Sequence, residues 1–474
     1  MQATVKDKLI NGWSTVMRMS YSCRLWLAFG AIMGGLFVVL SPPFTSPDEY
    51  GHFLRAYHCS IGRVYATKFK YGQDTYLGDG LPVSLESVCY DLVPPKTKLH
   101  SYQLQFTTDK LREAYSRSLE PDHCKMIQFS NSALYSPVPY VPAAFAMAIA
   151  RSCGMGPLLI FYCGRAGTLA AFLVLVAMAI EITPVHKWTM MLVALMPLPM
   201  YLASALSADP ITTGFALLAT AMTLRCALCA EKIGRRDLLG LSLAFCLLAL
   251  CKQFYIPLVL MFFIIPARKI GGIRRYIWAI LGVVVLPAAL NLGWIISMQP
   301  LYVPGRPGIN PPAQLHYVFG HPTQFASLMY EALCHVHLYR DVVGLLGWLD
   351  VRLPWNVFYM YWIALIVTAF CDTAAPWHLS WRIRGVTLII TVVTLLCLAM
   401  SMYLSWTAVG AARIEGLQPR YFLPLLPLFL LSLRGHISTG PIMRYLRPIA
   451  PVATLATVLI ACIASVSTMV HYYW

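Results

Sequence analysis

A pair of carboxylates stands where an apolar segment ends. The stretch SPPFTSPDEYGHF, residues 41–53, places Asp48 and Glu49 side by side just after an apolar run. Ionisable groups at membrane depth are expensive and usually mark a functional cavity. His52 would share a helix face with Glu49, as half of a general-base pair or of a metal site. In the plainer interpretation, the acids cap a helix that begins near Pro47 and His52 lies among lipid headgroups.

Three more charged residues interrupt apolar blocks. Arg165 lies inside an apolar helix, where a guanidinium must meet a carboxylate, a phosphate, helix carbonyls or the interface. Asp209 precedes Pro210 at a helix junction, where capping of the next helix is the alternative role. Lys252 suits a lipid phosphate or pyrophosphate at the outer interface, with snorkelling as the alternative.

The segment YLSWTAVGAARIEGLQPRYFLP, residues 403–424, is dense in polar groups between two apolar blocks. Arg413, Glu415, Gln418 and Arg420 cannot all face lipid. We expect Glu415 to pair with one of the two arginines. The other arginine would then be available to an anionic ligand, because its planar fork suits phosphate oxygens.

These features predict one outward-facing cavity lined by carboxylates and cations. The stretch GWLDVRLPW, residues 347–355, adds Asp350 and Arg352 at another helix end. In such a cavity a base would activate an acceptor while cations hold a phosphate leaving group. No metal-ligand cluster is evident in the sequence. Asp48 and Asp209 are the candidates if a divalent cation is bound, and that question is left open.

The composition is that of a polytopic membrane protein. The 474 residues are 58% hydrophobic and 12% charged, with a mean hydropathy of +0.64, whereas a soluble chain carries about a quarter charged residues. We therefore expect an all-α helix bundle that forms a single membrane domain over residues 1–474. The apolar blocks are 25–41, 138–152, 157–182, 188–206, 210–230, 237–250, 255–267, 277–298, 355–371, 386–404, 421–433 and 449–469.

The net charge of +16 indicates topology rather than nucleic-acid binding. Basic residues cluster in short segments between apolar blocks, and short basic loops stay on the cytoplasmic side. These residues are Lys6, Lys8, Arg18 and Arg24; Lys232, Arg235 and Arg236; Arg268, Lys269, Arg274 and Arg275; Arg382 and Arg384; and Arg434, Arg444 and Arg447.

The basic loops place three polar segments outside the cytoplasm. These are a large first loop at 44–137 that carries the acidic motif, a second at 299–354 with amphipathic helices, and a short third at 405–420. Asp209 is also expected outside the cytoplasm. An even number of crossings must therefore separate it from the first loop. We therefore expect the short, proline-bounded block 138–152 to be re-entrant or juxtamembrane. About eleven transmembrane helices and an outside C-terminus follow.

Cysteines give little functional signal. Cys226 and Cys229 form a C-x-x-C within or at the end of an apolar helix, where buried thiols behave as small hydrophobes. Cys59, Cys89 and Cys124 lie in the first loop. If that loop is outside the cytoplasm, we expect a disulfide between two of them, without knowing which two.

Five motifs in the same order resemble a bacterial family of polytopic membrane proteins, catalogued as a domain of unknown function and grouped with the GT-C glycosyltransferases. The resemblance spans about residues 25–435, and its last motif is the most specific. The motifs are PDEYGHFLRAY (47–57), ALYSPVPYVP (133–142) with Gly164 and Arg165, SADP (207–210), LGWLDVRLP (346–354) and SWTAVGAARIEGLQPRYFLPLLP (405–427).

The resemblance implies a GT-C-like fold and an inverting sugar transfer from a polyprenyl-phosphate-linked donor to a glycan or glycolipid acceptor. Asp48 or Glu49 would be the catalytic base or a ligand of the acceptor or of a metal, and Asp209 would match a second acidic position. Our candidates for binding substrate or its phosphate are His52, Arg165, Asp209, Lys252, Arg413, Glu415, Gln418 and Arg420. Tyr50 departs from the small or proline residue usual at its position, which concerns acceptor fit.

The favoured interpretation is a transferase of the bacterial inner membrane that modifies an envelope polysaccharide, such as O-antigen, capsule or cell-wall polymer, on the periplasmic side. The alternatives are a flippase or transporter of lipid-linked oligosaccharides and a polysaccharide polymerase. Transport predicts charges near the bilayer midplane and repeat symmetry. The charges here gather at one interface, which favours an enzyme.

Overall fold

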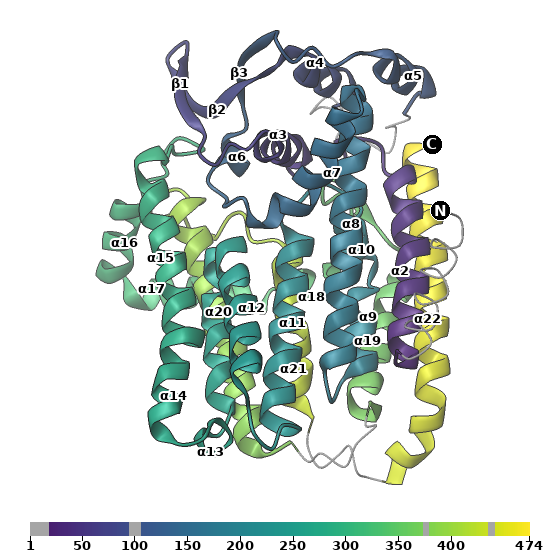
Figure 1. Ribbon diagram of the computed structural model, residues 1–474, viewed down its shortest axis with the longest axis vertical. Coiled ribbons are helices and arrows are strands. Elements are labelled where there is room, and N and C mark those ends of the chain that lie inside the picture. Colours follow the sequence, from purple (N-terminus) through teal and green to yellow (C-terminus); the bar gives the residue numbers. More distant parts are fainter. Residues whose placement is uncertain (1–18, 94–105, 373–378, 435–440) are drawn as a thin grey trace.

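The computed structural model describes residues 19–93, 106–372, 379–434 and 441–474. Most of these residues form helices that run side by side in one bundle (Figure 1). Within these ranges, six helices are long and apolar enough to cross a membrane. They are α2 (Tyr21–Leu40), α8 (Pro157–Ile182), α11 (Asp209–Leu228), the continuous stretch Ile273–Leu301, α20 (Trp381–Ser405) and α22 (Pro441–Tyr473). The prediction of a helical membrane protein is thus confirmed.

Several apolar segments are shorter or broken. Proline causes some breaks, because it removes a backbone donor and crowds the preceding turn: Pro257 lies within η2 and Pro424 within η5. The segments are α9 (Lys187–Ala194), α10 (Pro197–Ala203), α12 (Arg235–Cys251), η2 (Gln253–Ile264), α13 (Ala267–Ile270), α19 (Trp355–Cys371), η5 (Pro419–Leu425) and α21 (Leu426–Leu433). The stretch from Ile273 comprises α14 (Ile273–Ile280), η3 (Leu281–Val285), α15 (Leu286–Met298) and η4 (Gln299–Leu301).

A cap covers one end of the bundle and was expected only as a polar loop. It contains an antiparallel sheet in the order β1-β2-β3, with Thr67 opposite Gly78 and Gly78 opposite Gln128. Its elements are α3 (Glu49–Ser60), β1 (Thr67–Tyr71), β2 (Asp74–Pro82), α4 (Val83–Leu92), α5 (Thr108–Ser116), β3 (Cys124–Gln128), α6 (Ser130–Ala133), η1 (Val138–Tyr140) and α7 (Val141–Ser152). The all-α expectation therefore missed this sheet.

After η4, the described part of the segment 299–354 supplies three short α-helices and a two-stranded ladder. They are α16 (Pro311–Gly320), α17 (Pro322–Cys334), α18 (Val336–Asp341), β4 (Leu345–Leu346) and β5 (Val351–Arg352). Helices α16 and α17 pack against α20.

A basic segment lies at the end of the bundle opposite the cap. The cap occupies one end in Figure 1, and α13, which carries Arg268 and Lys269, lies at the other. The end of α22 lies beside the cap, where Phe106 N donates to Tyr473 O at 2.8 Å. The C-terminus is therefore at the cap end, as the expected topology requires. Lys6, Lys8 and Arg18 lie outside the described residues.

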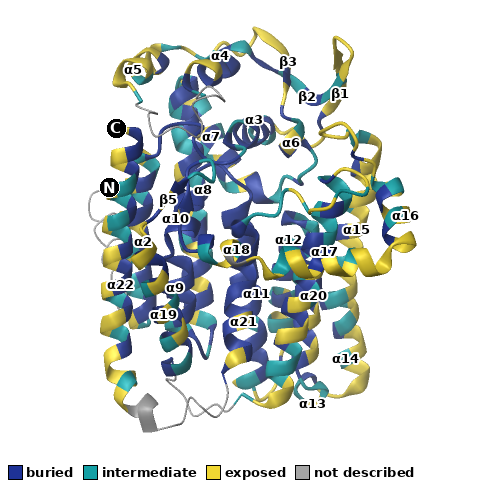
Figure 2. Cartoon of the chain, turned by 180° about the vertical axis from the view of Figure 1, so that it is seen from behind, coloured by how far each residue is buried: buried dark blue, intermediate teal, exposed yellow. Residues whose placement is uncertain are grey.

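The outer faces of several helices carry exposed apolar side chains. Figure 2 shows exposed residues along α14, α15 and α22, while α11 is largely buried. Ile273, Trp278 and Leu239 are among the most exposed large hydrophobic residues. Such a surface is stable in lipid, where apolar side chains meet acyl chains and helices satisfy their own backbone groups.

The block 138–152 forms η1 and α7 rather than a long helix. Helix α7 has 12 residues, so it is about 18 Å long at 1.5 Å per residue. A hydrocarbon core is about 30 Å thick. Helix α7 is therefore too short to cross it. It packs against α8 and against α3 of the cap.

The expected disulfide in the first loop is wrong. Cys59, Cys89 and Cys124 are all free thiols. Cys89, on α4, is buried, whereas Cys124 is exposed on β3. The spacing of cysteines along a loop does not show which side of a helix or strand each one faces.

The contact between α7 and α8 depends on Gly167. A Cβ atom there would lie 2.6 Å from the Pro142 carbonyl oxygen and 2.8 Å from the Cβ of Ala146. Gly167→Ala should therefore destabilise the protein by about 1–3 kcal/mol through overpacking, and lower its thermal midpoint in detergent. Gly293→Ala is the matched control, because nothing lies within 4 Å of its Cβ position. Equal midpoints for the two variants would contradict this packing.

Candidate functional site

The loop from Ser41 to Asp48 turns the chain from α2 into α3. Ser41 ends α2, and Glu49 begins α3. Phe44 and Asp48 have φ angles of 64° and 59°, in the left-handed region. Such a conformation costs a non-glycine residue about 1–3 kcal/mol and persists only where surrounding contacts enforce it. The loop that carries the acidic motif is therefore strained at two positions.

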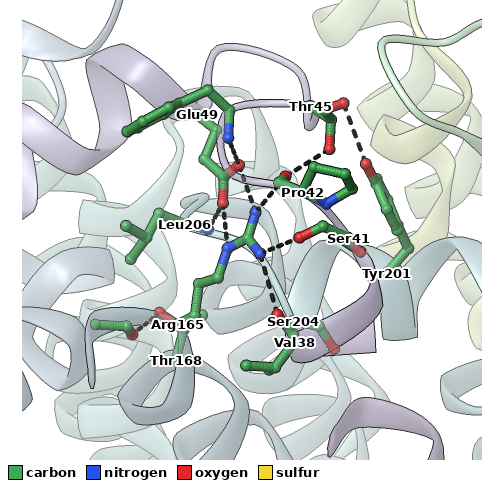
Figure 3. Close-up of polar contacts among 12 residues, drawn as sticks. Val38, Ser41, Pro42, Thr45, Glu49, Arg165, Thr168, Tyr201, Ser204 and Leu206 are labelled. Atoms are coloured by element: carbon green, nitrogen blue, oxygen red, sulfur yellow. Dashed lines mark hydrogen bonds and ion pairs between the residues drawn. The ribbon is translucent and has the colours of Figure 1, made fainter. Parts of the chain in front are cut away.

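Glu49 and Arg165 form a fully buried ion pair (Figure 3). Arg165 Nε donates to Glu49 Oε1, and Nη2 donates to Oε2, both at 2.8 Å. Each carboxylate oxygen accepts a second bond at 3.0 Å, Oε1 from Leu206 N and Oε2 from Phe44 N. Glu49 is thus saturated with donors and remote from solvent. Of the partners left open for Arg165 by the sequence, the structure shows a carboxylate and backbone carbonyls.

Asp48 faces a different set of residues. Arg420 Nη2 donates to Asp48 Oδ2 at 3.1 Å, and Arg420 Nη1 lies 3.3 Å from Asp209 Oδ2. Lys252 donates to the other oxygen of Asp209, and Ser207 Oγ donates to Asp209 Oδ2 at 3.1 Å. We name Asp48, Asp209, Lys252 and Arg420 the charge cluster. The four residues come from separate parts of the sequence, and all four were among the charged residues predicted to line one cavity.

The charge cluster combines one accessible acid with buried cations. The side chain of Asp48 is 31% exposed, whereas that of Arg420 is 4% exposed. Among the described residues, Nε of Arg420 has no hydrogen-bond partner, and Nη1 has only its ion-pair contact with Asp209. A buried donor without a partner is costly, so a ligand oxygen that reached Arg420 would be stabilised there.

Aromatic rings surround Lys252. Its Nζ lies 4.7 Å from the ring centroid of Tyr421 and 5.8 Å from those of Tyr135 and Phe254. Ring faces stabilise a cation and exclude water from it. They leave Asp209 as the close anionic partner of Lys252 among the described residues.

His52 lies beside the charge cluster on the cap side. Its Nδ1 is 2.7 Å from the hydroxyl oxygen of Tyr140. Burial lowers the pKa of His52 to about 4, with Asp48 raising it and Arg420 lowering it. His52 is therefore neutral at pH 7 and is suited to hydrogen bonding rather than to charge pairing.

The other candidates of the late segment do not join the charge cluster. Arg413 is exposed, and Gln418 is half-buried with no hydrogen-bond partner for Oε1 among the described residues. The expected pairing of Glu415 with Arg413 or Arg420 is wrong, because Arg306 Nη1 from the preceding loop donates to Glu415 Oε2 at 3.1 Å. The loop that contains Arg306 is brought to Glu415 by tertiary packing that the sequence does not reveal.

Asp350 and Arg352 also have their own partners. Tyr472 donates to Asp350 Oδ2 at 3.0 Å, and Arg352 Nη2 lies 3.8 Å from Asp341 Oδ2. Asp350 thus connects the turn before β5 to α22, and Arg352 connects β5 to the end of α18; neither joins the charge cluster.

No group of three or more His, Cys, Asp or Glu side chains gathers in a metal-binding arrangement within the described ranges. Asp48 and Asp209 were the two candidate ligands. Arg420 contacts both of them, so a guanidinium occupies the position between the carboxylates that a bridging cation would take.

Sequence analysis missed a buried relay in the cap. Arg55 Nη1 donates to His58 Nδ1 at 2.9 Å, so His58 presents its Nε2–H to Asp79 Oδ2 at 2.8 Å. Arg55 also donates to the carbonyls of Val64 and Tyr135. The three-residue spacing of Arg55 and His58 on α3 was the available signal, but nothing in the sequence pointed to Asp79 on β2.

These features define the class of the protein, a polytopic helical membrane protein with an acid–base cluster beneath a folded cap. The chain belongs to the family described as "Predicted membrane protein (DUF2142)", whose model matches residues 31–429. The suspected family membership is thereby confirmed, and the match includes every residue of the charge cluster. No curated protein and no solved structure matches the chain.

The relay predicts a pH dependence of stability. Burial first, and then the charge of Arg55, lowers the pKa of His58 from 6.5 to about 4. Between these values the unfolded chain binds a proton that the folded protein does not, so stability is lost as the pH falls below about 6.5. His58→Gln keeps an acceptor and a donor without this titration. Its thermal midpoint should therefore fall less than that of the wild type between pH 7 and pH 5.

Between pH 7 and pH 5, the wild type should lose about 2 kcal/mol more of its free energy of unfolding than His58→Gln does. His123→Gln is the control, because His123 is exposed and its variant should follow the wild type. If the thermal midpoints of His58→Gln and the wild type fall by the same amount on acidification, His58 is not held neutral by the fold.

Proposed function

We propose that this protein is a GT-C-type glycosyltransferase that moves a sugar from a polyprenyl-phosphate donor to an envelope glycan or glycolipid. The observation that supports it is the charge cluster, in which a partly exposed carboxylate lies next to two buried cations. A base that activates an acceptor and cations that hold a phosphate leaving group are the two requirements of this transfer.

The proposed chemistry assigns one role to each member of the charge cluster. Asp48 accepts the proton of an acceptor hydroxyl as its oxygen attacks the anomeric carbon of the donor sugar. The bond from that carbon to the phosphate oxygen breaks, and the polyprenyl phosphate leaves with the electron pair. Lys252 and Arg420 neutralise the developing charge on the phosphate, and attack from the opposite face inverts the anomeric centre. Asp209 holds both cations in place.

Asp48 is the better candidate for the base than Glu49. Both oxygens of Glu49 already accept two hydrogen bonds each, and its side chain is fully buried. Asp48 is directly accessible, and its contact with Arg420 involves one of its two oxygens.

The proposal includes a GT-C-like arrangement with about eleven crossings. The six long helices supply six of them. The remaining five would be α9 with α10, α12, η2, α19, and η5 with α21. The cap and the charge cluster would face the periplasm of a bacterial inner membrane, because the basic segment of α13 lies at the opposite end.

One observation favours a transferase over a flippase or transporter. The charge cluster lies where α11 begins and α12 ends, next to the cap, whereas transporter sites lie near the bilayer midplane. A polysaccharide polymerase would use the same donor and the same cluster, and differs in its acceptor.

Loss of the Asp48 carboxylate should abolish transfer. In cells that lack the native protein, Asp48→Asn should reduce the sugar modification of the envelope glycan at least about 100-fold, the usual contribution of a general base. Mass spectrometry of the glycan, normalised to the amount of folded protein in the membrane, measures the effect. Asp109→Asn, on the exposed surface of α5, is the matched control and should behave as wild type. A wild-type glycan from Asp48→Asn would refute the proposed role.

A further inference from the structure

The buried pair of Glu49 and Arg165 contacts every segment that carries an acid of the charge cluster. Arg165 donates to the carbonyls of Val38, Ser41 and Pro42 at 3.2, 2.7 and 3.2 Å. It thus binds the last turn of α2 and the start of the strained loop. It also binds Glu49, which is the first residue of α3 and directly follows Asp48 in the chain (Figure 3).

Glu49 reaches the segment of the second acid as well. Its Oε1 accepts from Leu206 N, three residues before Asp209 in the chain. One carboxylate group is therefore bound both to the loop that ends in Asp48 and to the loop that ends in Asp209. Arg420 contacts both acids, so their separation must match the span of one guanidinium group.

We propose that Glu49 and Arg165 are positioning residues, which fix Asp48 and Asp209 at the separation that Arg420 and the substrate require. This inference rests on the proposed function for the role of Asp48. It assigns no proton transfer to Glu49, although Glu49 adjoins the base. The strained φ angles of Phe44 and Asp48 are the conformation that the pair enforces.

The chemistry of a buried ion pair gives this role a distinctive signature. Removal of one partner leaves an uncompensated charge in the interior, whereas removal of both leaves none. Each single neutral variant should therefore displace the loops, and the double variant should be closer to wild type than either single variant. A catalytic Glu49 could not be rescued in this way.

Other contacts keep the loop folded when the pair is removed. Tyr201 donates to Thr45 O at 3.1 Å, and Trp348 Nε1 donates to Phe44 O at 3.0 Å. The expected result of a single substitution is thus a displaced loop in a folded bundle, which can be measured.

The test compares Glu49→Gln, Arg165→Gln and the double variant in nanodiscs and in cells. Hydrogen exchange of residues 41–60 and 204–210, followed by mass spectrometry, reports on the two loops without any substrate. Each single variant should exchange faster in both segments and lose at least about tenfold in glycan modification. The double variant should recover much of both. Arg117→Gln, which removes the ion pairs of the cap with Asp91 and Glu113, is the control and should change neither.

The outcomes separate this inference from the proposed function. Unchanged exchange in both single variants would overturn the positioning role, whatever the glycan shows. A double variant as defective as the worse single variant would overturn it too. So would faster exchange with full glycan modification, if Asp48→Asn is inactive. Full modification by Asp48→Asn would instead refute the proposed function, and the exchange data alone would then decide whether the pair holds the two loops.

Discussion

The site depends on one guanidinium group in the interior of α8. Arg165 carries a charge that lipid and packed side chains cannot solvate, and the structure supplies a carboxylate and three carbonyls instead. Buried pairs of this kind contribute little net stability, but they tolerate few geometries. The chain must therefore bring the end of α2, the start of α3 and the loop before α11 to one point. The charge cluster forms beside that point.

The different surroundings of the adjacent acids Asp48 and Glu49 follow from this constraint. Asp48 and Glu49 are neighbours in the sequence, but the left-handed conformation of Asp48 directs them into different surroundings. Glu49 enters a dry interior, where it is saturated with hydrogen bonds. Asp48 remains partly exposed next to Arg420. A paired motif that looks redundant in the sequence thus has one member suited to holding structure and one suited to chemistry.

The sequence predicted the membrane class, the family and a larger set of converging charged residues, of which Asp48, Asp209, Lys252 and Arg420 come together. Each of these residues lies between or at the edge of apolar blocks, and charge at such positions is rare enough to be informative. The partners were less predictable. The pairs Glu49–Arg165 and Glu415–Arg306 join residues 116 and 109 positions apart, and nothing local encodes them. The sheet of the cap escaped prediction because its short strands resemble polar loop.

The central claim is that the buried cations beneath the cap hold a lipid phosphate. Its most direct test is the affinity of the purified protein in nanodiscs for a polyprenyl monophosphate, measured for the wild type, Lys252→Met and the exposed control Lys110→Met. The account predicts at least a tenfold weaker affinity for Lys252→Met and wild-type affinity for Lys110→Met. Equal affinities of wild type and Lys252→Met would contradict it.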